Sequence, residues 1–387
     1  MRISKLRSTW HPLVLVTLVI GINACSRPDW IFRQSAPKPE AKQQVEGSLT
    51  FQNIILKQTN AEGQLLWQIK AKQATYRNNQ KAAQIKEIQG NLYQGGKAAF
   101  KVEAEQGEVQ QDDQKVVLKG KIIATDLQDG VVFKGREVEW RPQEDLLTVR
   151  KDLTVIHAQI QMWAREARAS SRTHQVVAQG QVVAETRSPV LRLRTERVVW
   201  QIAQQQISTD LGQGSSTPRG IEIQQFVNKT ISNRAYAGEA KVNLKTNIVT
   251  FQAPAEISLL NPPLDVSSQQ LRWDVNRQLV ISDRPVQVSD RRQKVTLTAN
   301  QGYLNQSQQL VQLTGAVRAE GWRNRSVLTT DQLTWLLPNQ QIEARGHVFY
   351  QQEESPRFSL KGPRAIGRIQ EQTILISGGG VVTEIFP

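Results

Sequence analysis

The stretch GEVQQDDQKVVLKGKIIA, from Gly107 to Ala124, alternates apolar and polar residues on both sides of a polar run. After a polar run at 110–113, the apolar residues Val116, Leu118 and Ile122 share one parity. Residues of one parity in a β-strand point to the same face of the sheet. The polar run itself has the composition of a turn. The stretch therefore predicts two antiparallel strands joined by a turn, with one apolar face and one polar face.

This pattern recurs along the chain, and eight copies align without gaps. Their first residues are Gly107, Val138, Ala167, Val198, Ala240, Leu271, Gly302 and Leu333. Successive copies start 31, 29, 31, 42, 31, 31 and 31 residues apart. A fixed period of this length indicates a protein built from repeated supersecondary units. Each unit here is predicted to be a pair of strands.

Apolar residues recur at three positions of the repeat. The third position contains Val109, Trp140, Ala169, Trp200, Val242, Trp273, Leu304 and Trp335. The tenth contains Val116, Leu147, Val176, Ile207, Val249, Val280, Val311 and Ile342. The sixteenth contains Ile122, Leu153, Val182, Gln213, Ala255, Val286, Val317 and Val348, of which Gln213 alone is polar. No stretch of useful length has the period of an amphipathic helix, so the predicted class is all-β.

The fourteenth position has the inward parity but is glycine in four copies: Gly120, Gly180, Gly315 and Gly346. A glycine that points inward leaves space beneath it or marks a β-bulge. A tight bend alone is an equally good interpretation.

The single step of 42 residues predicts a boundary between two lobes. The residues by which this step exceeds the usual period lie in LGQGSSTPRG at 211–220, which has the Gly, Ser and Pro content of a loop. We expect a first lobe over 50–210, a connector over 211–237 and a second lobe over 238–387. The strand-like IEIQQFVN in the connector has the pattern needed to continue the sheet across it.

The N-terminal segment, residues 1–24, has the features of an export signal. Basic residues come first, and about ten mostly apolar residues follow over 13–22. This apolar run is too short for a membrane-spanning helix, which needs about 20 residues. The chain's only cysteine, Cys25, follows directly in a context that resembles a bacterial lipobox. We expect Cys25 to be lipidated, with 25–49 as a flexible spacer; the alternative is an uncleaved signal anchor.

Composition and motifs indicate a binding protein rather than an enzyme. The formal charge is +14, with Lys and Arg scattered along 387 residues, which suggests a polyanionic partner. For an exported protein we expect a lipid phosphate rather than nucleic acid. The histidines His11, His157, His174 and His347 stand far apart in sequence. No nucleophile elbow, P-loop or EF-hand motif is present, so we expect no catalytic residue, cofactor or metal site.

The repeat resembles the OstA-like lipopolysaccharide-transport family over about residues 50–387. The similar elements are the apolar-x-aromatic strand, the polar turn and the second strand, as in VVLKGKIIA and LVQLTGAVRA. An N-terminal membrane anchor before such a domain resembles the LptC family in particular. The chain is about twice as long as the common form of this family. A long form of this kind is expected in cyanobacteria.

The resemblance implies an extended open β-jelly roll, here in two lobes, with acyl chains in its groove. It also implies a position on the periplasmic face of the inner membrane. There the protein would receive lipopolysaccharide from the permeases of an ABC transporter and pass it toward the outer membrane. A periplasmic bridge protein of the same fold, similar to LptA, is the implied next partner. Sheet edges would pair with such partners by strand addition.

The apolar positions of the repeat are the candidate groove residues. They are Val109, Val116, Leu118, Ile122, Trp140, Leu147, Val176, Val182, Trp200, Trp273, Val286, Val311, Val317, Trp335 and Val348. The alternative for any one of them is a place in a closed core without lipid contact. Two other classes of function stay open: a structural scaffold of the cell envelope and a glycan-binding lipoprotein. The inward parity of the tryptophan column speaks against glycan binding.

Overall fold

A computed structural model describes residues 48–77, 82–110, 115–210 and 220–386. Residues Glu46–Pro387 form one compact unit. Cys25, the export segment 1–24 and most of the spacer 25–49 lie outside the described residues, as does Gln213. Within the described ranges, no helix has the length and apolar character needed to cross a membrane.

The described part of the chain is all-β, which confirms the predicted class. The first ten strands are β1 (Ser48–Thr59), β2 (Leu65–Arg77), β3 (Ala82–Gln94), β4 (Lys97–Gln110), β5 (Val116–Asp126), β6 (Val132–Arg141), β7 (Leu146–Ile156), β8 (Ile160–Ser170), β9 (Gln175–Thr186) and β10 (Val190–Gln201). The next eight are β11 (Gln206–Asp210), β12 (Ile221–Val227), β13 (Thr230–Ala237), β14 (Glu239–Asn243), β15 (Ile248–Leu259), β16 (Leu264–Asp274), β17 (Leu279–Ser282) and β18 (Val286–Asp290). The last eight are β19 (Val295–Ala299), β20 (Gln301–Asn305), β21 (Leu310–Gly321), β22 (Ser326–Leu336), β23 (Gln341–Gln352), β24 (Arg357–Arg368), β25 (Thr373–Ser377) and β26 (Val382–Phe386).

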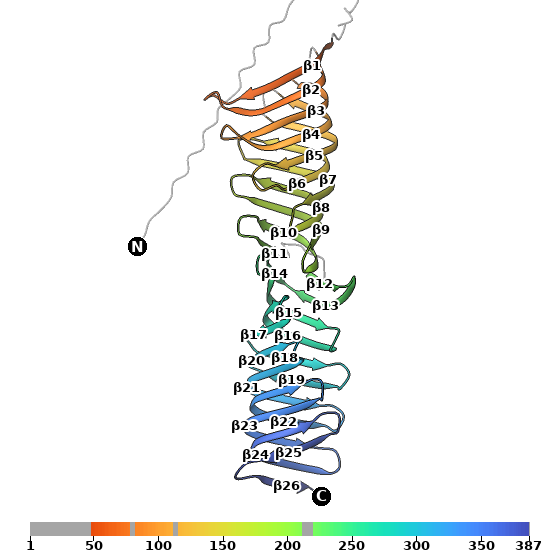
Figure 1. The fold of residues 1–387 in the computed structure, drawn as a ribbon, viewed down its shortest axis with the longest axis vertical. Coiled ribbons are helices and arrows are strands. Elements are labelled where there is room, and N and C mark those ends of the chain that lie inside the picture. Colours follow the sequence, from red (N-terminus) through yellow and green to blue (C-terminus); the bar gives the residue numbers. More distant parts are fainter. Residues whose placement is uncertain (1–47, 78–81, 111–114, 211–219, 387) are drawn as a thin grey trace, which may run out of the picture. The chain divides into compact units, whose positions relative to one another are not determined.

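The strands pair antiparallel in one continuous sheet. From β1 to β10 each strand pairs with the next one along the chain. β10 then pairs with β11 through 197–201 and with β12 through 190–194. The sheet continues through β15 and β16 to β26 (Figure 1). Within the unit, the order along the sheet therefore follows the order of the repeat.

Most long strands are divided in the middle by a bulge. The pairing of β5 with β6 shifts register between Lys119 and Ile122, and the neighbouring pairs shift at equivalent places. We call this line of bulges the corner. Half A is the part of the sheet that contains Val116–Lys119, and half B is the part that contains Ile122–Asp126. Half A continues through successive strands to β25, and half B continues to β26.

The glycines of the fourteenth position lie at the corner. Gly120, Gly180, Gly315 and Gly346 have φ between +80° and +92°. Each falls inside the two-residue gap where the ladder changes register. The positive φ is the left-handed conformation that glycine adopts without steric cost. Of the interpretations left open by the sequence, the structure therefore supports the β-bulge.

The core lies between halves A and B. It is one continuous cluster of buried apolar side chains, from Trp67 in β2 to Ala365 in β24. Trp140, Trp200, Trp273 and Trp335 are among its largest fully buried members. The alternation of buried and exposed residues along β5 follows the predicted parity. The polar face of the strands is consequently turned away from this core.

The predicted connector contributes strands of its own. β12 pairs with β10, and β13 pairs with β15, so both extend half B across this region. Over the same region, β11 and β14 extend half A, again by antiparallel pairing. The two predicted lobes thus lie in one compact unit, and their separate roles stay a prediction.

Candidate functional site

The structure brings all fifteen candidate groove residues into the core between the two halves. Each is buried, and the most exposed, Val109, has 7% of its surface accessible. All belong to the single apolar cluster. Half A contributes residues such as Trp140 and Leu147, and half B contributes residues such as Ile122 and Val317. The columns of the sequence therefore correspond to one continuous apolar layer with walls from both halves.

Opposite the corner, the hairpin turns of half A face those of half B. We call this side of the sandwich the mouth. His174, in a turn of half A, has Nδ1 2.8 Å from Oδ2 of Asp129, in a turn of half B. Its Nε2 lies 3.3 Å from Nε2 of Gln128. These contacts join turns that are 45 residues apart in sequence, and they connect the two halves across the mouth.

Further contacts of the same kind follow along the mouth. Gln159 Nε2 donates to Gln205 Oε1 at 3.2 Å. Asn233 Nδ2 donates to Gln306 Oε1 at 3.2 Å, and Gln306 Nε2 donates to the carbonyl of Asn261 at 2.9 Å. Each contact is a neutral hydrogen bond between side chains or between a side chain and the backbone. Individually such bonds contribute about 1 kcal/mol, so the mouth is closed by modest interactions.

Aromatic side chains at the mouth shield the core. The His157 ring lies edge-on to Trp200, with ring centroids 5.1 Å apart. Burial lowers the pKa of His157, so its ring is neutral at pH 7 and packs as an apolar group. The indole Nε1 of Trp140 donates across the sandwich to the carbonyl of Leu66 at 3.4 Å. The indole nitrogens of Trp67, Trp200 and Trp335 are buried with no hydrogen-bond partner among the described residues.

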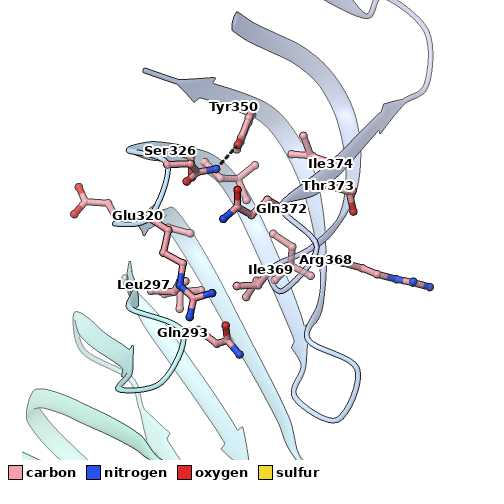
Figure 2. A pocket seen from close by; sticks show the side chains of 17 residues that line it. Gln293, Leu297, Glu320, Ser326, Tyr350, Arg368, Ile369, Gln372, Thr373 and Ile374 are labelled. Carbon is pink, nitrogen blue, oxygen red and sulfur yellow. Dashed lines mark hydrogen bonds between the residues drawn. The ribbon is translucent and has the colours of Figure 1, made fainter. Parts of the chain in front are cut away.

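Toward the C-terminal end, the two halves enclose a small cavity of about 90 Å³ (Figure 2). Its half B wall is formed by β19, β21, β22 and β23, and its half A wall is formed mainly by β24, β25 and the turn between them. The apolar lining consists of Val295, Leu297, Ala319, Leu328, Ile342, Ile369 and Ile374. In the described part of the chain, no hydrogen bond or ion pair crosses the mouth between the turns at 322–325 and 369–372. The sandwich is therefore less tightly closed here than at His174.

Polar side chains surround the opening of this cavity. Gln372 projects between Tyr350 and Ile369 (Figure 2). The Tyr350 hydroxyl accepts a hydrogen bond from Asn324 Nδ2 at 3.4 Å, and burial raises the pKa of Tyr350. Gln293 Oε1 is buried without a hydrogen-bond partner in the described residues. The site thus combines an apolar interior with amide and hydroxyl groups at its edge, which is the usual composition of a ligand pocket.

Sequence reasoning did not single out this cavity. Ile342 belongs to the tenth column, yet it is partly exposed where the other seven members are buried. Its column gave no signal of this difference. The contacts of Asp129 and His174 were also missed, because they join separate copies of the repeat. Elsewhere in the described ranges, Asp, Glu and His side chains form no group of three that could hold a metal ion.

Part of the chain matches the model of a known protein family. Residues 13–185 match the model described as lipopolysaccharide-assembly, LptC-related. This region includes the sheet from β1 through nearly all of β9 and eight of the candidate groove residues, Val109 to Val182. No curated protein matches the chain significantly. Residues 13–185, somewhat less than half of the chain, are therefore similar to the LptC-related family of lipopolysaccharide assembly.

Proposed function

We propose that this protein is a long LptC-type component, anchored in the inner membrane, that carries lipopolysaccharide between halves A and B of its sheet. It would receive the lipid from the permeases of an ABC transporter and pass it toward the outer membrane. The observation that carries the proposal is the apolar layer, which is continuous from Trp67 to Ala365 and has equivalent residues in successive copies. Equivalent sites in a row allow a lipid to move between them with little change in free energy.

Acyl chains would bind by replacing contacts between the two halves. Each square ångström of buried apolar surface contributes about 25 cal/mol, so several chains can be held by area alone. Entry requires the halves to separate at the mouth, where the closing hydrogen bonds are few. The buried indole N–H groups of Trp67, Trp200 and Trp335 would then have partners in the ester or amide carbonyls of the lipid.

The two ends of the sheet provide surfaces for partners of the same fold. At one end, β1 exposes Leu49 and Ile55 and pairs with β2 alone among the described strands. At the other end, β26 exposes Ile385 and pairs with β24. Unpaired edges with apolar side chains favour strand addition. We therefore place the transporter and an LptA-like bridge protein at these edges.

Crosslinking to lipid tests the proposal directly. A photo-crosslinking residue at Leu118 or Val317, both buried in the core, is expected to form lipopolysaccharide adducts in cells. The same residue at Glu139 or Gln201, which have the opposite parity, is expected to form none. Because a bulky probe can unfold a core, circular dichroism and thermal melting must first show a native-like protein.

Equal amounts of adduct at the buried positions and at the positions of opposite parity would contradict transport between the halves. Adducts at Leu118 without adducts at Val317 would restrict transport to the region that matches the family. In that case the second predicted lobe, 238–387, would serve as a docking platform.

A further inference from the structure

The C-terminal cavity has a basic rim on its half B side. Two consecutive turns of this half form the rim: Arg291–Lys294 before β19, and 322–325 between β21 and β22. The backbone N–H of Trp322 donates to the carbonyl of Lys294 at 3.2 Å. The guanidinium of Arg323 donates to the carbonyl of Arg292 at 3.2 Å. The two turns are thereby held together beside the opening, and Arg323 itself lines the cavity.

Several charges at this end of the molecule are already neutralised by ion pairs. Arg325 pairs with Glu354 at 3.7 Å, and Arg291 pairs with Asp265. Glu320, the one carboxylate that lines the cavity, accepts from Arg318 Nε at 2.7 Å.

Three other cations of the rim have no such partner. In the described part of the chain, no carboxylate pairs with Arg292, Lys294 or Arg323. Trp322 lies on the same rim, with 68% of its surface exposed. An exposed tryptophan beside uncompensated cations is typical of a surface that meets lipid headgroups.

The cavity itself selects the apolar part of the ligand. A volume of about 90 Å³ is smaller than an engineered apolar cavity of about 150 Å³ that admits benzene. It therefore accepts the end of one alkyl chain and not a whole acyl chain. The chain end would contact Leu297, Ile342 and Ile374, which lie on both walls.

We propose that this cavity and its rim form a binding site for lipopolysaccharide, with one acyl end in the cavity and an anionic group of the lipid on Arg292, Lys294 and Arg323. The site lies outside the region that matches the family, 13–185. The choice of ligand rests on the proposed function. The charge of the rim supplies what the apolar layer lacks, a group that holds the polar end of the lipid at a fixed place.

The test uses the full chain in cells, with a photo-crosslinking residue at Ile374, which is partly buried on the cavity wall. We expect lipopolysaccharide adducts at this position. Arg323→Gln is expected to lower the yield about fivefold, the ratio that corresponds to about 1 kcal/mol for one basic residue near an anionic lipid. Arg325→Gln is the matched control. It removes the same charge from the same turn, but from a residue that is paired with Glu354, and the yield should stay unchanged.

A second probe at Leu118 separates this proposal from the proposed function. Adducts at Leu118 in both variants, together with the loss at Ile374 in Arg323→Gln alone, would support the site. Adducts at Leu118 with none at Ile374, or an equal yield at Ile374 in both variants, would overturn the site and leave the proposed function intact. Phospholipid adducts at Ile374 would also overturn it. Absence of lipopolysaccharide adducts at both positions would contradict the proposed function itself.

Discussion

At the residue scale, the corner glycines determine how sharply each strand bends. Gly120 has φ of +92°, and an added Cβ would lie 2.8 Å from the Cβ of Glu105 on the neighbouring strand. Non-glycine residues are accepted at the corner of β7, where Lys151 and Asp152 have φ of 63° and 53°. The corner therefore needs glycine only where the left-handed φ is large and the next strand is close.

Gly120→Ala is expected to destabilise the protein by about 1–3 kcal/mol, because strain at positive φ adds to the clash with Glu105. Gly130→Ala is the control. Gly130 also has positive φ, +71°, but an added Cβ would meet nothing within 4 Å. Its cost should be smaller and arise from strain alone. Urea unfolding of the full chain measures both, and equal losses of stability would show that the contact with Glu105 is unimportant.

At the element scale, the turns at the mouth hold the two halves together. His157 begins the turn between β7 and β8 and packs against Trp200 of β10. Its Nδ1 accepts the backbone N–H of Gln159 at 3.3 Å, which requires that this nitrogen be unprotonated. Burial is the main cause of the lowered pKa of His157; the nearby Asp129 raises it and Arg187 lowers it.

This lowered pKa predicts a loss of stability in mild acid. Below the unfolded pKa of about 6.5, the unfolded chain binds a proton that the folded His157 resists, so folding stability falls as the pH falls. His157→Gln removes this linkage. The free energy of unfolding should therefore decrease less between pH 7.5 and pH 5.5 in the variant than in the wild type. Parallel changes in the two proteins would mean that His157 is as easily protonated in the folded state as in the unfolded state.

At the scale of the whole molecule, the proposed transport would require the sheet to be held at the membrane. Cys25 is the residue predicted to provide the anchor, through a lipid attached after export. Two acyl chains or more give stable attachment, because each buried methylene contributes about 0.8 kcal/mol. A signal anchor would retain the protein by its apolar segment instead.

Cys25→Ala is expected to abolish metabolic labelling with a radioactive fatty acid and to block maturation at that site. Membrane fractionation of the same cells shows which anchor operates. Wild-type protein that stays in the membrane fraction without any acyl label would favour the uncleaved signal anchor.

Several features of this protein follow from the sequence by itself. The period near 31 residues and the parity of the apolar columns are enough to predict paired antiparallel strands with one buried face. Trp140, Trp200, Trp273 and Trp335 are buried as that parity requires. The prediction succeeds because alternation along a strand is a local property, which the chain expresses wherever one face of a sheet is covered.

The way in which the two halves meet is visible only in the folded protein. The hydrogen bond between Asp129 and His174 joins turns from different copies of the repeat, and the cavity beside Ile342 and Ile374 draws its walls from strands far apart in sequence. Both depend on the bend at the corner and on the stacking of successive strands. Identical columns can therefore yield a closed core at one place and an open cavity at another, because the distance between the halves is set by contacts that no single copy contains.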